Sequence, residues 1–434
     1  MKRKLFKQLL HEWRSNLWIA VELLVVSVVL WYVTDYLTVQ AIVLSKDQGF
    51  DAENCYMVSY SYLSESNPMY DSSDTTLEAK NGHFLQMTDR IRNFPGVEQL
   101  ALCSHTGVPY KQNSWIVNLT RYAGADTTVI SGTNIKQVSP EYLTMLRIKG
   151  PGGETPEELA KVIESGRCII SGGIYILTGY SQEKIDLALE KGACQNPSQL
   201  VGQSFMCEAF STSDSLRIGA VKCPAKRTEY ELPSEDIMIP LRLDSDNFPI
   251  IMIRVAPDAA EGFEDRFMAA AEEHFRGGNF YVTEAEALAD IKEITQADNN
   301  EEVRNFIVVM VFILTSIFLG ITGTFWFRTQ QRTGEIAIRK VNGATPASIM
   351  KRLLSEGILI LAIVTPAALF FDWLLCHYQL NTPLHWLEPY FSPPRFFIAA
   401  AIVFALLALM ITAGILFPAI RAMRTDPATA LKDE

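Results

Sequence analysis

The residues of this chain that carry chemistry are scattered and form no recognisable catalytic motif. His83, His105 and His274 are isolated in the sequence, and we interpret each as a lone surface histidine. Glu272-Glu273 falls on a predicted helix, where adjacent side chains diverge, and Glu235-Asp236 is typical of solvated loop. No P-loop, H-E-x-x-H, G-x-S-x-G or Cys-x-x-Cys sequence occurs. We therefore expect no catalytic residue, bound cofactor or metal in this chain.

One short basic stretch, residues 332–344, has the punctuation of an independent helix. Thr333 is placed to cap its start, and Glu335 in the first turn precedes Arg339 and Lys340 in the last, an order that complements the helix dipole. Gly343 is placed to end it in the left-handed conformation. A second helix is then predicted to begin at Thr345-Pro346.

Ile338 and Val341 give this short helix an apolar edge, because residues three apart share one face. Two interpretations follow from the pattern. The edge binds a partner protein, so that the helix acts as a mechanical handle, or it lies against lipid headgroups. The pattern alone does not choose between them.

Four long apolar stretches predict an integral membrane protein, since a hydrocarbon core about 30 Å thick needs roughly 20 apolar residues in a helix. One precedes residues 39–303 and three follow. The predicted fold class is four transmembrane α-helices, one plus three, with a large α+β periplasmic domain. Its length allows two folding units, and we expect two lobes. The predicted spans are 17–38, 305–327, 353–376 and 396–417.

Charge predicts the orientation of these spans. Residues 39–303 hold 39 Asp and Glu against 22 Lys and Arg, whereas the rest of the chain holds 10 against 16. Basic short segments stay cytoplasmic. We therefore expect the N-terminus, 1–16, and the C-terminal tail, 418–434, inside, and 39–303 in the periplasm of a bacterial inner membrane. A cleaved signal peptide is disfavoured, because the first stretch is too long and no clear cleavage site follows.

Six of the seven cysteines lie in the predicted periplasmic domain, where an oxidising compartment permits disulfides. Cys207 and Cys223 flank a predicted hairpin across 211–214 and are the first candidate pair. Six buried free thiols are an equally good interpretation.

Charged and small residues inside the predicted spans suggest how the helices pack. Charges at Glu22 and Glu356 are costly unless paired, so we expect ion pairs, with Arg352 one helical turn before Glu356 as a partner. Small residues let helices approach closely, either within one chain or between two chains. They form two predicted faces: Ser316, Gly320 and Gly323, and Ala401, Ala405, Ala408 and Thr412.

Two motifs resemble one known family. R-T-G-E-I-A-I-R-K-V-N-G-A-T followed by I-M-K-R-L-L-S-E-G is similar to the signature loop of MacB/FtsX-type permeases of ATP-binding cassette (ABC) systems, and F-P-A-I-R-A-M-R-T-D-P-A-T-A-L-K-D-E resembles the end of the same domain. V-S-P-E-Y-L-T-M-L-R-I and L-V-G-Q-S-F with I-G-A-V-K weakly resemble its external core. Residues 304–417 would then be the FtsX-like permease domain. MacB itself carries a fused nucleotide-binding domain, and this chain has none.

The resemblance implies a mechanism and partners. A separate cytoplasmic ABC ATPase, which itself binds ATP and Mg, would dock beneath residues 335–343. ATP-driven dimerisation would push two permease chains together, identical or paralogous. The result would be either export or a relay of force through the helices to the periplasmic domain. A periplasmic adaptor is a further possible partner in this family, and nucleic acid is not.

Two other function classes stay open. A membrane-anchored sensor or scaffold would use the acidic domain to bind an extracytoplasmic ligand and would need no ATPase. A membrane-bound enzyme is the weaker alternative, for lack of a motif. The sequence does not identify the cargo: peptides, lipoproteins, macrolides and activation of peptidoglycan hydrolases all fit this layout.

Overall fold

The computed structural model describes residues 13–74, 76–121, 128–172, 176–178, 197–207, 215–233, 236–243, 248–383 and 390–424. The predicted turn at 211–214, Cys194, Glu235 and the end of the C-terminal motif lie outside these ranges. The chain divides into two compact units. We call Met1–Ile42 with Asn299–Glu434 the helical unit, and Val43–Asp298 the sheet unit.

Five helices account for the described part of the helical unit. Four of them are long and apolar enough to cross a membrane, over Leu17–Leu44, Leu288–Gln331, Pro346–His377 and Pro393–Arg421. One precedes the sheet unit and three follow it, the order that the sequence predicts. The full bounds are α2 Trp13–Leu44, α8 Leu288–Gln331, α9 Thr333–Val341, α10 Pro346–His377 and α11 Pro393–Arg424.

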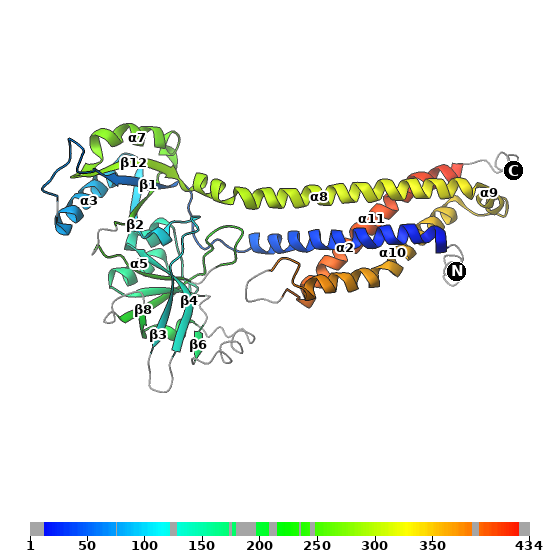
Figure 1. Cartoon of the computed structure of the whole chain (residues 1–434), viewed down its shortest axis with the longest axis horizontal. Coiled ribbons are helices and arrows are strands. Elements are labelled where there is room, and N and C mark those ends of the chain that lie inside the picture. The colour runs from blue at the N-terminus through cyan, green and yellow to red at the C-terminus, as the bar shows by residue number, and fades with distance from the viewer. Residues whose placement is uncertain are drawn as a thin grey trace. The chain divides into compact units, whose positions relative to one another are not determined.

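Helix α8 is one uninterrupted helix of 44 residues (Figure 1). No proline occurs in it and no glycine before Gly320, so nothing in its first eight turns breaks the backbone hydrogen bonds. At 1.5 Å per residue it is about 66 Å long, more than twice the thickness of a hydrocarbon core. Its first third is polar, and the helix begins directly after strand β12, which ends at Ala287.

The four long helices pack around a common apolar core, to which each contributes, for example Leu30, Ile317, Leu361 and Leu407. Helices α10 and α11 approach most closely at Gly357, where an added Cβ would lie 2.7 Å from Ile411 Cγ2. Such contact needs glycine.

The small residues predicted for helix packing divide between two environments. Gly320 packs within the chain, since a Cβ there would lie 2.5 Å from Glu22 Oε1. Ala408 is partly buried against the core. The other predicted positions are exposed in this single chain: Ser316, Gly323, Ala401, Ala405 and Thr412. Only part of each predicted face is therefore used for packing inside one chain.

The sheet unit contains a twelve-stranded sheet in the order β11-β12-β1-β10-β2-β4-β3-β7-β8-β5-β9, with β6 on β4. Its strands are β1 Cys55–Tyr62, β2 Val97–Cys103, β3 Ile116–Arg121, β4 Thr128–Val138, β5 Cys168–Ser171, β6 Ile176–Thr178, β7 Ser204–Cys207, β8 Ser215–Lys222, β9 Asp236–Pro240, β10 Ile250–Val255, β11 Arg276–Gly277 and β12 Phe280–Ala287. Its helices are α3 Leu77–Arg92, α4 Pro140–Met145, α5 Pro156–Glu164 and α7 Phe263–His274, with 3-10 turns η1 His105–Gly107, η2 Pro197–Leu200 and η3 Pro257–Ala259.

Strand pairing separates this sheet into two lobes. Strands β4, β3, β7, β8, β5 and β9 close on themselves, because β9 also pairs with β4 in parallel from Asn134↔Asp236 to Val138↔Pro240. The interior of this small barrel is filled by side chains such as Leu119, Phe205 and Ile237. Strands β11, β12, β1, β10 and β2 form an open antiparallel sheet, with α3 and α7 packed on it through Phe84 and Phe267. A single pair, Cys103↔Val138, joins β2 to β4.

Cys207 and Cys223, the first candidate disulfide pair, are not joined by a disulfide in this structure. The hairpin itself is present, with Ser204 opposite Arg217 and Met206 opposite Ser215. This register places Cys207 at the turn end of the hairpin. Cys223 follows β8 at the other end, so two cysteines that flank the hairpin in sequence do not face each other.

The sequence suggested that Asp236 lies in a solvated loop, and this prediction is wrong. Asp236 begins β9, is fully buried, and its carboxylate contacts Lys136 Nζ at 2.7 Å and Lys222 Nζ at 2.8 Å. Burial by itself would raise the pKa of Asp236, but the two ammonium groups outweigh it and hold that pKa below its ordinary value. Burial lowers the pKa of Lys222, against the opposing effect of Asp236.

Candidate functional site

The short helix α9 begins immediately after α8 with only Arg332 between them. The backbone continues to hydrogen-bond through this turn, because Arg332 N–H donates to Arg328 O and Ile336 N–H to Arg332 O. The sequence predicted that Thr333 caps a free helix start, and this prediction is wrong. The Thr333 hydroxyl donates to Gln330 O at 2.7 Å and lies 3.1 Å from Thr329 O. The turn is tight, and the last carbonyls of α8 are satisfied by the first residue of α9.

The end of α9 follows the sequence prediction. Gly343 has φ +85°, Gly343 N–H donates to Lys340 O, and Ala344 N–H donates to Arg339 O. These two bonds form a Schellman motif. Thr345 then caps α10 by accepting a bond from Ser348 N–H at 3.3 Å, with Pro346 as the first helical residue. Helix α9 is thus held in a defined direction at both ends.

One face of α9 packs on the bundle and the other is exposed. Ala337 is 3% exposed, and Ile336 is partly buried against the apolar core. Ile338 and Val341 are 53% and 67% exposed. Two exposed aliphatic side chains one turn apart on this helix form a small apolar surface, which we call the α9 edge.

Charged side chains fix α9 to its neighbours. Glu335 pairs with Arg339 on the same helix, and Arg352 Nη2 of α10 lies 3.7 Å from Glu335 Oε1. Lys340 Nζ donates to Met423 O near the end of α11, at 2.6 Å. Glu335, Arg339 and Lys340, which the sequence suggested as coupling residues, therefore hold α9 in place, whereas the α9 edge remains exposed.

Glu356 has other partners than the predicted Arg352. Its buried carboxylate, on α10, lies 3.5 Å from Arg328 Nη1 and 3.3 Å from Arg332 Nη1, at the end of α8. Arg352 is one turn away on the same helix but is directed to Glu335. These groups surround a cavity of about 80 Å³ between α8, α9 and α10. One carboxylate on α10 thereby holds the turn between α8 and α9.

The predicted ion pair of Glu22 is not found among the described residues. Glu22 on α2 is half-buried, and its carboxylate lies against Gly320 of α8. The structure does not describe the side chain of Arg14, a basic residue on the same helix as Glu22.

A second buried ion cluster, which sequence reasoning missed, joins Asp35 in the second half of α2 to Arg395 at the start of α11. Arg395 Nε donates to Asp35 Oδ1 at 2.7 Å and Arg395 Nη2 to Asp35 Oδ2 at 2.5 Å. Asn381 Nδ2 donates to Asp35 Oδ2 at 3.2 Å. The signal was present in the sequence, because Arg395 is the only Lys or Arg in 377–395 and Asp35 is a charged residue inside the first predicted span, near its outer end.

Neither ion cluster is arranged for catalysis. Within the described ranges no group of three or more His, Cys, Asp or Glu is placed to hold a metal ion. Each carboxylate of the two clusters is matched by arginine at hydrogen-bond or ion-pair distance, which favours a structural role.

Comparison with known proteins gives helix α9 a family context. Residues 307–427 match the family model described as FtsX-like permease C-terminal. This match supports a permease family. The permease region contains α9, α10, α11 and most of the apolar part of α8, and so all of the α9 edge and the Glu356 cluster.

Two further comparisons were made. No sequence match is found among the curated proteins. A solved structure from Porphyromonas gingivalis, a domain of a protein described as a permease, is similar over 54% of this chain and 91% of its own, with 13% identity and a TM-score of 0.29. Four apolar helices together with the permease match indicate a multi-pass membrane protein.

Proposed function

We propose that this chain is the permease subunit of an ABC system of the MacB/FtsX type, and that the α9 edge docks a separate cytoplasmic ATPase. The observation that carries the proposal is the exposure of Ile338 and Val341 on a helix that Glu335 joins to α10 and Lys340 joins to α11. The match to an FtsX-like permease domain supports a partner of this kind. ATP and Mg would be bound by the partner, and this chain would have no catalytic role.

The same proposal assigns force transmission to α8. A docked ATPase moves α9, the Arg328–Arg332–Glu356 cluster passes that movement to the end of α8 and to α10, and an unbroken helix carries it toward the sheet unit. A continuous helix resists bending over its length far better than a loop of equal length. This mechanism places α9 in the cytoplasm and residues 39–303 in the periplasm.

A charge on the α9 edge tests the docking step. Val341→Arg and Ile338→Arg put a guanidinium where an apolar contact is proposed, and both positions are exposed, so the fold is expected to survive. We expect the cognate ATPase to co-purify about tenfold less or worse, since a central apolar contact is worth about 2 kcal/mol or more. Met69→Arg, at a position 63% exposed in the sheet unit, is the matched control and leaves co-purification unchanged.

A ligand sensor that needs no ATPase is the second candidate function. A large cavity in the sheet unit favours it. The Val341→Arg variant separates the two candidates. A sensor should retain its response to ligand in this variant, whereas an ATPase-driven permease should lose its ATP-dependent movement. Full co-purification of the ATPase with Val341→Arg would contradict the docking assignment.

A further inference from the structure

The cavity in the sheet unit has a volume of about 580 Å³ and runs along strand β1. Six consecutive residues, 57–62, line it. Because successive side chains of a strand point to opposite faces, a cavity that touches all six borders the main chain of the strand itself. The cavity is therefore a groove along an edge of β1.

The pairing of β1 explains why an edge is available there. On one side β12 pairs with β1 from Tyr56 to Tyr62. On the other side β10 pairs only with Cys55–Val58, because β10 begins at Ile250. Among the described residues no strand pairs with Ser59–Tyr62 on that side. Alternate residues of this segment direct N–H and C=O into the groove. Such an edge is a template for another strand.

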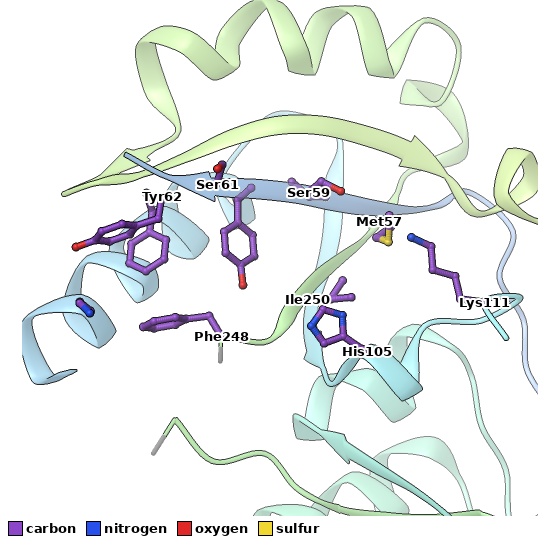
Figure 2. A pocket seen from close by; sticks show the side chains of 12 residues that line it. Met57, Ser59, Ser61, Tyr62, His105, Lys111, Phe248 and Ile250 are labelled. Carbon is purple, nitrogen blue, oxygen red and sulfur yellow. The ribbon is translucent and has the colours of Figure 1, made fainter. Parts of the chain in front are cut away.

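The two ends of the groove differ in chemistry. Figure 2 shows Tyr62 and Phe248 at one end and His105 and Lys111 at the other. At the first end the rings of Tyr62 and Phe248 pack edge to face on Phe280, with centroids 4.9 and 4.8 Å away. This end suits an apolar or aromatic side chain.

The groove as a whole is basic in a strongly acidic region. Residues 39–303 hold 39 acidic against 22 basic residues, yet none of the described residues that line the groove is Asp or Glu, and Lys80, His105 and Lys111 line it. Lys80 lies at the aromatic end, where its Nζ is 5.7 Å from the centre of the Tyr62 ring, and His105 and Lys111 lie at the opposite end. The charge of the groove is thus opposite to that of its surroundings and complements an anion.

We propose that this groove binds an extended acidic peptide, which adds a short strand to Ser59–Tyr62. The main-chain groups of the peptide pair with the edge of β1, an apolar side chain enters the aromatic end, and a carboxylate meets His105 and Lys111. A peptide is favoured over a lipid anion because only a peptide supplies regularly spaced donors and acceptors to a strand edge. This inference does not depend on ATPase docking at α9.

A random heptapeptide display library panned on the full chain in phosphatidylcholine nanodiscs tests the proposal. We expect enriched sequences to combine Asp or Glu with apolar residues at alternate positions. The selected peptides should bind Lys111→Glu about tenfold or more weakly than the parent. Lys161→Glu, an exposed reversal on α5, is the matched control and binds like the parent.

Backbone methylation separates strand addition from other binding modes. Single N-methyl groups placed along a selected peptide should abolish binding at every second position and be tolerated between, because only alternate N–H groups face β1. Unchanged binding of every N-methylated peptide would overturn the proposal that the peptide adds a strand to β1. Enrichment without acidic residues, unchanged binding to Lys111→Glu, or binding of hexadecanoate but of no peptide overturns the proposal as a whole.

Discussion

Asp35 and Arg395 form a paired ion bridge between α2 and α11, with N–O distances of 2.7 and 2.5 Å and both side chains almost completely buried. The residues are 360 positions apart in the sequence. Arg395 also donates to Thr382 O, and Asn381 contacts both Asp35 and Tyr390 O. Helix α2 is thereby tied to α11 and to described residues of the segment that connects α10 with α11.

Removing one partner of this bridge should destabilise the helical unit strongly. Asp35→Leu leaves a buried guanidinium without its counter-ion, which typically costs about 3–5 kcal/mol. We expect a clear drop in thermal unfolding temperature in detergent. The exposed pair Asp89–Arg92 serves as the control, since Asp89→Ala should cost less than about 1 kcal/mol.

The double variant Asp35→Leu/Arg395→Met sharpens this test. It removes both charges, so most of the lost stability should return. If the double variant is as unstable as Asp35→Leu alone, the loss does not come from an unpaired buried charge.

The partners of Glu356 give a second prediction. Glu356→Gln leaves Arg328 and Arg332 close together without a carboxylate, and we expect a loss of about 3 kcal/mol and a more mobile α9. Arg352→Gln, which removes a partly exposed contact of 3.7 Å to Glu335, should cost less than about 1 kcal/mol. A spin label at the exposed Asn342 measures the mobility of α9. Equal effects of the two substitutions would instead support the Arg352–Glu356 pair that the sequence suggested.

The buried cluster of Asp236 with Lys136 and Lys222 predicts acid sensitivity of the sheet unit. The pKa of Asp236 is lowered in the folded chain, so its stabilising contribution is present above the unfolded pKa of about 3.9 and is lost as the pH falls through the folded pKa. The pKa of Lys222 is also lowered in the folded chain, so the unfolded chain binds the proton of this ammonium group more readily. This difference also makes stability fall as the pH falls. Unfolding followed against pH should show stability falling toward acid.

Substitutions in this cluster should differ in severity at neutral pH. Asp236→Asn leaves two buried amines without a carboxylate and should cost about 3–5 kcal/mol. Lys222→Met leaves a one-to-one pair of Lys136 with Asp236 and should lie within about 1 kcal/mol of the parent. A severe loss in Lys222→Met with little loss in Asp236→Asn would contradict this account.

Local features of this fold could be predicted from the sequence, and non-local ones could not. The end of α9 at Gly343 and the start of α10 at Thr345 depend on residues a few positions apart, and the pattern predicts both. The choice of Arg328 and Arg332 as partners of Glu356 depends on how α8 packs against α10, which no local pattern encodes.

The sheet unit shows the same division more clearly. The β7–β8 hairpin is local and was predicted, but its register, which separates Cys207 from Cys223, was not. Asp236 looks like a loop residue beside Pro233, yet the parallel pairing of β9 with β4, about a hundred residues earlier in the chain, buries it beside Lys136. The groove along β1 likewise results from where the distant strand β10 begins.

The orientation of the chain is the prediction on which ATPase docking depends. We expect Asn342→Cys, at the exposed end of α9, to be protected from a membrane-impermeant maleimide in spheroplasts and to react once the membranes are opened. Met69→Cys, exposed in the sheet unit, should react in intact spheroplasts. The parent chain, whose described cysteines are buried except for the half-buried Cys223, gives the background. Because ATP is cytoplasmic, labelling of Asn342→Cys in intact spheroplasts would exclude α9 as the ATPase dock, while the peptide groove on β1 would have to be tested independently of it.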